Sequence, residues 1–188
     1  MSERIPIVPP AEADLDFVSG PKRPDGMGVR YFLVGDVIEG AWTASPLLEG
    51  WSGLVHGTAF AALHDEAAIY AIVYLASETG FTTRIDTRFR RPIRIGERVV
   101  VRARVAKVGE RGATVASEIV LADGAVASTA ETDYAFADEA ALLRVLGRPL
   151  SPFLAGWIRA PKAKRLGLAI EWSRERTALA EGRARAHA

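Results

Sequence analysis

A long apolar run near the middle of the sequence constrains the fold more than any other feature. From Thr58 to Ala76 every residue is apolar, Ala or Tyr except Thr58 itself and the consecutive residues His64, Asp65 and Glu66. Neither Gly nor Pro interrupts the run, so it predicts one helix, and a helix that is apolar on every side has to be buried. Its length would be about 28 Å, but the three ionisable residues argue against a transmembrane span.

A soluble domain must therefore surround this helix. The chain has 188 residues, of which 49% are hydrophobic and 25% charged, and this is enough for one sizeable core. The simplest cover for the helix is a sheet. Carboxylates in the middle of a buried helix cost several kcal/mol unless they are paired, hydrated or protonated. Asp65 and Glu66 are therefore the first indication of a functional site.

Charge and cysteine content restrict the classes of function. The net charge is +1, which argues neither for nor against a polyanionic partner, although 10 of the 24 Lys and Arg but only 5 of the 23 Asp and Glu lie in residues 138–188. The chain has no Cys, which rules out disulfides, thiolate nucleophiles and Cys-ligated metals. Its first residues lack the basic start and long apolar run of a signal peptide, so we expect a cytoplasmic protein.

Strand patterns flank the helix on both sides. Residues 1–27 are rich in Pro and predict an extended lead-in with one short helical turn at Ala11–Phe17. Gly28–Asp36 and Ile38–Ala44 predict two antiparallel strands. Alternation of apolar and polar residues then predicts four more strands. In the first of them Thr83, Ile85, Thr87 and Phe89 face one way. The four strands are Phe81–Arg91, Arg98–Lys107, Ala113–Ala122 and Ala125–Ala137. Short turns separate them, so we expect one antiparallel meander.

The order of elements predicts an α+β domain over residues 28–137, in which an antiparallel sheet curls around one long central helix. Residues 138–188 predict a C-terminal helical, basic extension. Asp138 and Ser151 are expected helix N-caps, because Ser and Asp side chains accept hydrogen bonds from the first N–H groups of a helix. From Lys162 onward we expect a partner-contacting or frayed tail.

The segments around His56 and Asp65 resemble the hotdog-fold acyl-CoA thioesterases, more narrowly the phenylacetate-degradation and 4-hydroxybenzoyl-CoA types. The resemblance covers residues 20–137 and is carried by Leu54-Val55-His56-Gly57, Asp65 nine positions after His56, Thr82–Glu97 and the stretch Gly20–Gly28. It implies a dimer of hotdog folds, often paired again into tetramers. It further implies hydrolysis of the thioester of an acyl-coenzyme A, without a metal or a tightly held cofactor.

Thioester hydrolysis needs a group that activates water or attacks the carbonyl, and donors where negative charge develops on its oxygen. A helix N-terminus has free N–H groups, and Gly57 lets a carbonyl approach closely because it has no Cβ. We therefore assign the Gly57 N–H to the oxyanion hole. Asp65, the acid that the resemblance selects, lies about 12 Å further along the same helix. The two groups must then come from different subunits related by a two-fold axis.

Each catalytic candidate has an alternative role. Asp65 is the candidate nucleophile or general base, or else a salt-bridge partner of an arginine. Glu66 lies roughly 100° around the helix and is the less favoured base. His56 would hydrogen-bond near the thioester or simply cap the helix, and Thr82 would position water or be ordinary strand material. We expect His64 to be a helix residue that is packed or paired at an interface.

The candidate substrate contacts lie in a basic stretch after the third predicted strand and at the start of the helix. Arg90, Arg91 and Arg94 would meet the coenzyme A phosphates, or would form a solvated strand face. Thr58 replaces the second glycine of the family and would narrow the pocket or add a donor to it. Some relatives have an amide side chain six residues before the histidine, where this chain has Gly50.

The acyl group is not defined by the sequence, although Phe60, Tyr70 and Tyr74 indicate an apolar pocket. The two departures from the family pattern leave open a second function, in which a non-catalytic hotdog protein binds an acyl-CoA or a protein partner. A hydratase of the same fold would need a histidine paired with Asp or Asn in a different motif, which the sequence lacks.

Overall fold

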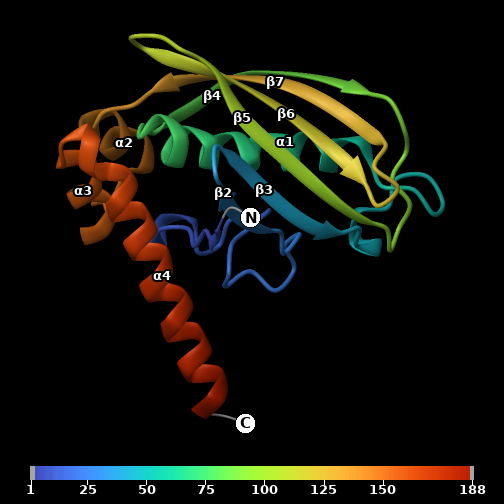
Figure 1. Cartoon of the computed structure of the whole chain (residues 1–188), viewed down its shortest axis with the longest axis horizontal. Helices are drawn as coiled ribbons and strands as arrows, with labels where there is room; N and C mark the ends of the chain where they lie inside the picture. The colour runs from blue at the N-terminus through green and yellow to red at the C-terminus, as the bar shows by residue number, and fades with distance from the viewer. Residues whose placement is uncertain (1–2, 187–188) are drawn as a thin grey trace.

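The computed structural model describes residues 3–186 and has the predicted α+β architecture (Figure 1). The central helix α1 (Gly57–Ala71) continues as a π-helical segment (Ile72–Ala76). A seven-stranded antiparallel sheet curls around it. The prediction of one long helix covered by a sheet is therefore confirmed.

The sheet contains the six predicted strands and one further strand. Their bounds are β1 (Arg4–Pro6), β2 (Arg30–Val34), β3 (Val37–Thr43), β4 (Gly80–Phe89), β5 (Arg98–Val108), β6 (Gly112–Leu121) and β7 (Val126–Phe136). Their order across the sheet is β1-β2-β3-β5-β6-β7-β4, and all neighbours are antiparallel. The sequence did not predict β1, because three residues in a Pro-rich segment are too few to show alternation.

The expected meander through all four strands after the helix is wrong for β4. Only β5, β6 and β7 follow one another across the sheet, while β4 pairs with β7 at the far edge. Residues 90–97 cross to β5 by pairing with the loop that precedes α1. The Val55 N–H donates to the Ile93 carbonyl (2.9 Å), and the Ile95 N–H donates to the Gly53 carbonyl (3.0 Å). This connection contains Arg90, Arg91 and Arg94, the predicted contacts of the coenzyme A phosphates, and it passes the N-terminal end of α1.

Helix α1 is the centre of the hydrophobic core. Leu63, Ala67, Ala71 and Ile72 have no exposed surface, and each fully buried Leu or Ile side chain contributes about 1.5–3 kcal/mol to folding. By length and composition alone the stretch Gly57–Ala76 is apolar enough to cross a membrane. Here it contacts β3, β5, β6 and β7 and is the core helix of the sheet.

Three helices follow the sheet. Helix α2 (Glu139–Leu146) begins at Asp138, whose carboxylate accepts from the Ala141 N–H (2.7 Å), and α3 (Pro152–Arg159) begins at Ser151. Both predicted N-caps are thus confirmed. Helix α4 (Lys162–Ala186) is continuous and extends away from the sheet (Figure 1).

The first half of α4 is anchored to the core, in contrast to the expected frayed tail. Ala169 and Ser173 are buried, and the Ser173 hydroxyl lies 2.7 Å from the hydroxyl of Tyr74. The Ser173 hydroxyl also accepts from the Val8 N–H (3.0 Å). The hydroxyl of one α4 residue therefore joins the central helix, the N-terminal segment and the C-terminal extension.

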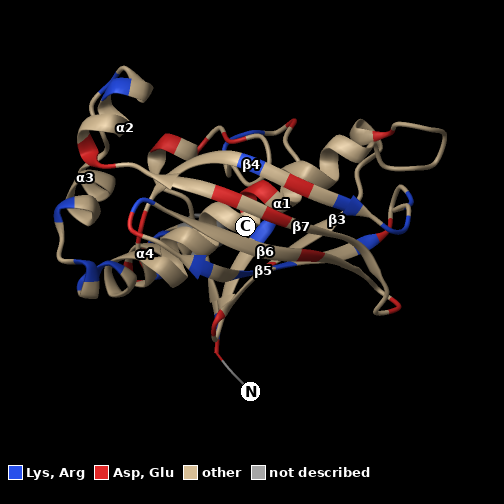
Figure 2. Ribbon diagram, turned by 90° about the horizontal axis from the view of Figure 1, so that it is seen from above, with Lys and Arg blue, Asp and Glu red and all other residues tan. Residues whose placement is uncertain are grey.

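Acidic and basic residues alternate along the outer face of the sheet (Figure 2). Arg84 pairs with Asp133 (2.9 Å), and Arg102 pairs with Glu39 (3.0 Å). Such exposed pairs contribute little to stability, but the mixed charges keep this face hydrated.

His64 points from α1 into the sheet, where it has no exposed surface. Its Nδ1 lies 2.8 Å from the Ser117 hydroxyl, and its Nε2 lies 2.8 Å from the Ser128 hydroxyl. Burial lowers the pKa of His64 from 6.5 to about 4. The ring is therefore neutral at pH 7, and the expectation of a packed and paired histidine is confirmed.

We expect the protein to lose stability as the pH falls from 6.5 to 4. Since the pKa of His64 is lower in the folded than in the unfolded chain, its contribution is complete above pH 6.5 and is lost as protons bind the unfolded state. The loss should reach roughly 2–3 kcal/mol at pH 4. A His64→Gln variant, which cannot take up a proton there, should be less stable at pH 7 but lose less on acidification.

Urea unfolding followed by tryptophan fluorescence at pH 7, 5.5 and 4 measures both proteins. The carboxylates elsewhere in the chain titrate equally in both, so only the difference between the two curves reports on His64. Parallel loss of stability in the two proteins would contradict this account.

Candidate active site

Asp65 lies on α1 where β4 and β7 meet the helix. Its Oδ1 accepts from the hydroxyl of Thr82 (2.6 Å) and from the hydroxyl of Tyr134 (3.1 Å), which also lies 3.0 Å from the Asp65 carbonyl oxygen. Burial, and then the nearby Asp65 carboxylate, raise the pKa of Tyr134 far above its ordinary value. Tyr134 therefore stays protonated, and its hydroxyl donates a hydrogen bond to the Asp65 carboxylate.

The alternative role of Asp65 as a salt-bridge partner is not seen. Within the described part of the chain no Lys or Arg nitrogen lies within 4.0 Å of its carboxylate. In the same part of the chain no hydrogen bond is made to Oδ2. The Asp65 carboxylate is thus held through Oδ1, while its Oδ2 receives no hydrogen bond from the described residues.

A bulge in β4 aims Thr82 at Asp65. The pairing of β4 with β7 shifts register between Thr82 and Arg84, so that Thr82 lies opposite Tyr134 while Thr83 is the extra residue. Thr83 donates instead to the Asp133 carbonyl (3.1 Å). The predicted alternation, with Thr83 on the same face as Ile85, is therefore wrong at this point, because a bulge re-aims the side chains that precede it.

His56 and Thr58 form the N-terminal cap of α1. The His56 Nδ1 accepts from the Thr58 N–H (3.1 Å) and lies 2.8 Å from the Thr58 hydroxyl. The capping role that the sequence offered for His56 is thus present. The Thr58 hydroxyl is engaged by this ring.

Gly57 is exposed as the first residue of α1, and its N–H has no acceptor within the helix. The side chain nearest to it is the Phe89 ring, which packs edge-to-face on Phe60 with centroids 5.3 Å apart. A Cβ added to Gly57 would meet that ring at 3.6 Å, an ordinary contact. Packing within one chain therefore does not require glycine here, whereas close approach of an outside group does.

Gly50, by contrast, is tightly packed against the helix cap. A Cβ at this position would lie 3.0 Å from His56 Cα and 3.1 Å from His56 Cβ. An amide side chain, as in some relatives, would fit only if the helix cap moved.

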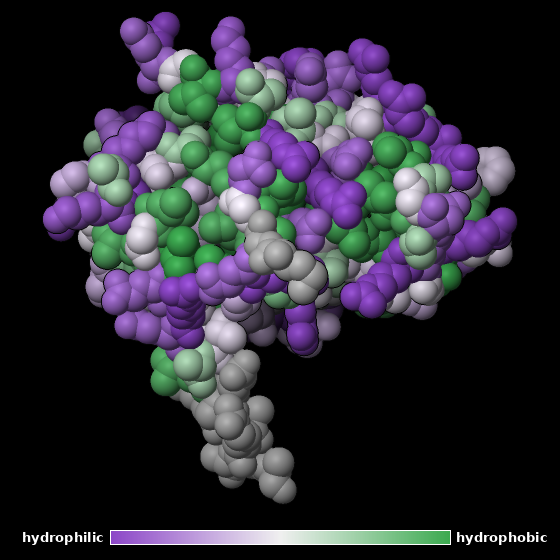
Figure 3. Space-filling model, in the orientation of Figure 1, coloured by the Kyte–Doolittle hydropathy of each residue, from purple (hydrophilic) through white to green (hydrophobic). Residues whose placement is uncertain are grey.

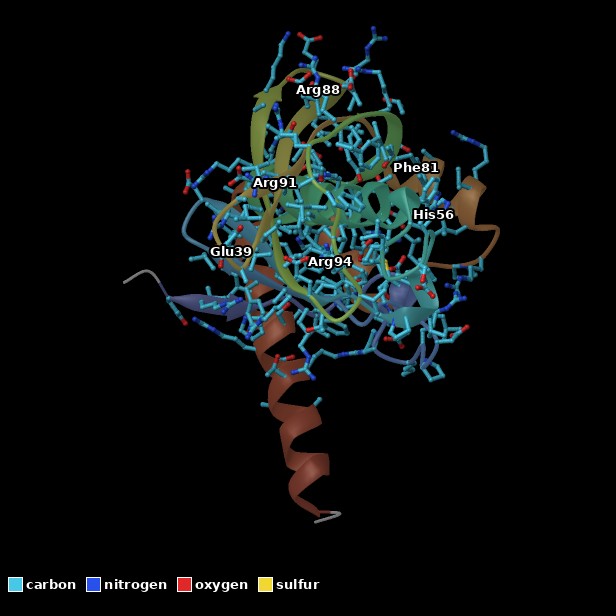
Figure 4. The ribbon with its side chains drawn as sticks, turned by 90° about the vertical axis from the view of Figure 1, so that its right-hand side faces the viewer. Glu39, His56, Phe81, Arg88, Arg91 and Arg94 are labelled. Atoms are coloured by element: carbon cyan, nitrogen blue, oxygen red, sulfur yellow. The ribbon has the colours of Figure 1, made fainter. Side chains whose placement is uncertain are left out.

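Arg90, Arg91 and Arg94 are all exposed after β4. Arg91 lies 3.8 Å from Asp123, and the N–H of Arg94 donates to Glu97 (3.0 Å). Figure 4 looks at the end of the molecule where α1 begins and shows Arg91 and Arg94 to one side of His56. These cations are therefore on the Gly57 side of the molecule.

Glu66, the alternative base, faces away from Asp65. Its carboxylate accepts from Ser19, whose hydroxyl lies 2.8 Å from that of Tyr70. Burial, followed by the charge of Asp16, raises the pKa of Glu66 to about 7. The two adjacent carboxylates thus have separate surroundings on different faces of the helix.

Sequence reasoning missed one site residue and misplaced two others. Tyr134 was not singled out, and only the pairing of β7 with β4 shows that it lies beside Thr82. Tyr70 and Tyr74 do not line the Asp65 site, because their hydroxyls contact Ser19 and Ser173. Of the three aromatic residues expected to form an apolar pocket, only Phe60 lies near Gly57.

Within one chain the structure therefore forms two half-sites. One contains Asp65, Thr82 and Tyr134, and the other contains His56, Gly57 and Thr58. Eight residues of helix separate Asp65 from Gly57, which is about 12 Å. One thioester carbonyl cannot reach both within the same chain.

An antiparallel sheet that curls around one central helix defines the hotdog fold. In this protein the helix also carries a carboxylate that is bound by two hydroxyls. The thioesterase superfamily matches residues 52–128, which contain Gly57, Asp65, Thr82 and the three arginines. The resemblance to the hotdog-fold thioesterases is thereby confirmed.

Solved structures show the same fold. A crystal structure described as a thioesterase superfamily protein is 26% identical with a TM-score of 0.58, and the match covers 64% of this chain and 60% of that one. This chain thus spans less than two thirds of that relative. The PaaI protein of the E. coli phenylacetic acid degradation operon is 17% identical (TM-score 0.55, 59% and 80% covered). A Streptococcus mutans protein bound to acetyl CoA is 13% identical (TM-score 0.50, 54% and 82% covered). No curated protein matches the chain.

We expect the hydroxyl of Tyr134 and the carboxylate of Asp65 to be energetically coupled. A hydrogen bond to a charged group contributes about 1.5–3 kcal/mol, so Tyr134→Phe should destabilise the protein by that order. In an Asp65→Ala background the same substitution should cost about 1 kcal/mol less, because the hydroxyl then retains only the Asp65 carbonyl as acceptor. Urea unfolding of the four proteins completes the cycle.

Thr83→Val is the matched control for this cycle. It removes a hydroxyl from the neighbouring β4 residue that does not contact Asp65, so its cost should be the same in both backgrounds. Strict additivity of Tyr134→Phe and Asp65→Ala would show that Tyr134 does not hold the carboxylate.

Proposed function

We propose that this protein is a thioester hydrolase that converts an acyl-coenzyme A to a free acid and coenzyme A. The observation that supports this most directly is the state of Asp65. Its carboxylate is fixed by two hydroxyl donors on Oδ1, while Oδ2 receives no hydrogen bond from any described residue. A carboxylate held in this way is oriented for use as a base or a nucleophile.

The reaction requires the second half-site. As a general base, Asp65 Oδ2 takes a proton from water while the water oxygen bonds to the thioester carbon. The carbonyl oxygen becomes an anion and accepts from the Gly57 N–H, reinforced by the dipole of α1. When the C–S bond breaks, the coenzyme A sulfur leaves and takes up the proton. As a nucleophile, Oδ2 would instead bond to the carbonyl carbon while the C–S bond breaks and coenzyme A leaves as its thiolate. Water would then cleave the resulting anhydride, which releases the acid, restores the Asp65 carboxylate and supplies the proton that the thiolate takes up.

The geometry favours a homodimer. A two-fold axis that sets two α1 helices antiparallel would bring Asp65 of one protomer near Gly57 of its partner. Strand β4 supports this arrangement, because it pairs only with β7 and leaves its other edge free among the described residues. Phe81 and Phe89 are 38% and 58% exposed on this strand. We propose that β4 pairs with its copy, alone or within a dimer of dimers.

Coenzyme A recognition is proposed for Arg90, Arg91 and Arg94. Their position on the Gly57 side agrees with a thioester carbonyl at the start of α1 and phosphates further out. The structural neighbour that binds acetyl CoA supports a CoA thioester as the ligand. The proposed reaction takes place in the cytoplasm and uses no cofactor beyond the substrate.

A second candidate function is binding of an acyl-CoA without hydrolysis. The contact between Gly50 and His56 favours it, because no amide side chain is available at that position to contact the thioester. A free-thiol assay across short-chain, aromatic and long-chain acyl-CoAs separates the two functions. Tight binding without release of thiol would favour this second candidate.

The two adjacent carboxylates allow a matched test of the mechanism. With an acyl-CoA that the protein hydrolyses, Asp65→Asn should lower kcat at least about 100-fold. Glu66→Gln should change it by less than about threefold, because Glu66 faces Ser19 on the other side of the helix. Gel filtration and circular dichroism establish that both variants keep the assembly and fold. Equal turnover by Asp65→Asn and the unaltered protein would refute the role of Asp65.

A further inference from the structure

An open cavity lies on the side of α1 that carries Glu66 and Tyr70, away from Asp65. It has a volume of about 1140 Å³, and its walls come from the N-terminal segment, β2, α1 and α4. Ligand pockets commonly have volumes of about 300–1,000 Å³, so this space is large enough for a small organic molecule. Most of its walls lie outside residues 52–128, the part that matches the thioesterase superfamily.

The mouth of this cavity is strongly cationic. Lys22, Arg23 and Arg30 are exposed, Arg176 is partly exposed, and no acidic side chain is among the lining residues. The carboxylate of Asp14, which lies behind the wall, pairs with both Lys22 (2.6 Å) and Arg176 (3.1 Å).

One of these cations has no acidic partner. Asp14 pairs with Lys22 and Arg176, and Asp25 pairs with Arg23 (3.2 Å). Asp16 and Glu66 lie further in, where their carboxylates accept from the N–H and the hydroxyl of Ser19. Arg30 forms no ion pair with any described residue. An unpaired cation at the rim of a cavity attracts anions.

The interior of the cavity is mainly apolar. Ile7 and Val29 are buried in its wall, and Val8, Phe32 and Leu179 also line it. Hydroxyls occur where the cavity meets the central helix, at Ser19, Tyr31 and Tyr70. They are already engaged within the chain, Tyr31 with the Leu63 carbonyl and Ser19 with Glu66 and Tyr70. Figure 3 shows hydrophobic patches bordered by hydrophilic residues above the point where α4 leaves the body.

We propose that this cavity is a second binding site, distinct from the Asp65 site, for an organic anion with an unbranched apolar chain, such as a medium-chain carboxylate. The carboxylate would bind at the mouth, with the unpaired Arg30 as its main partner. The chain would displace water from the walls formed by Val8, Phe32 and Leu179. Since α4 supplies one wall, the C-terminal extension would act as part of a binding site.

The chemistry of the walls favours this class over two simpler ligands. A small inorganic anion would leave the apolar interior unused, and a neutral chain would leave the cationic mouth without a partner. Burial of each CH₂ group contributes about 0.8 kcal/mol, so affinity should rise with chain length at constant charge. The proposal does not depend on catalysis at Asp65.

Calorimetric titration of the full chain with octanoate tests the proposal. Octanoate should bind at least about tenfold more tightly than acetate, 1-octanol or inorganic phosphate. Arg30→Gln, which breaks no ion pair of the described chain, should weaken octanoate binding at least about fivefold. Thr177→Trp, which places a large ring in the cavity from α4, should abolish it.

Two control variants locate the binding site. Arg88→Gln removes a cation from β4, at the opposite edge of the sheet, and Asp65→Asn alters the proposed active site. Both should bind octanoate as the unaltered protein does. If Arg30→Gln and Thr177→Trp retain full affinity, or if only Asp65→Asn changes it, octanoate binds elsewhere and the proposal is overturned. Equal affinity for octanoate and phosphate would overturn the assignment of an apolar ligand.

Discussion

The burial of α1 is the constraint on which the rest of the structure depends. Three consecutive ionisable residues on a buried helix point in three directions, since each step turns about 100°. Each needs polar partners because an unpaired buried group costs several kcal/mol. His64 finds them in the sheet, at Ser117 and Ser128, whereas Asp65 finds them at the meeting of β4 and β7, and Glu66 in the N-terminal segment.

The same constraint explains why the carboxylates of Asp65 and Glu66 differ in their surroundings. Asp65 is bound by hydroxyls through one oxygen and has no cation beside it in the described chain, so an oriented carboxyl group faces the β4 side. Glu66 is enclosed by Ser19 and Tyr70, and burial raises its pKa to about 7. Asp65 thus belongs to the candidate active site, whereas its neighbour Glu66 attaches the N-terminal segment to the helix. The cavity proposed to bind an organic anion lies on the Glu66 side, where the N-terminal segment and α4 close over β2.

The sequence predicted the elements better than their pairing. The unbroken apolar run defined α1, and alternation defined six of the seven strands, because both patterns are local. The position of β4 beside β7 depends on contacts between residues 53–55 and 93–95, which no local pattern reveals. For the same reason the bulge at Thr83 was missed, and with it the partnership of Thr82 and Tyr134. The spacing shared with the hotdog thioesterases selected Asp65 and Thr82, whose hydrogen bond the structure shows, but that resemblance ends before α4.

The central claim is that Gly57 of one protomer and Asp65 of its partner form one active site. Subunit complementation between Asp65→Ala and Gly57→Val tests this most directly, because a mixed dimer contains one site in which both residues are unaltered. Each variant alone should be inactive, and co-refolded equal amounts should regain about a quarter of the unaltered activity, since half of the dimers are mixed and each has one intact site. Mixed dimers that are detected by native mass spectrometry but remain inactive would contradict the account.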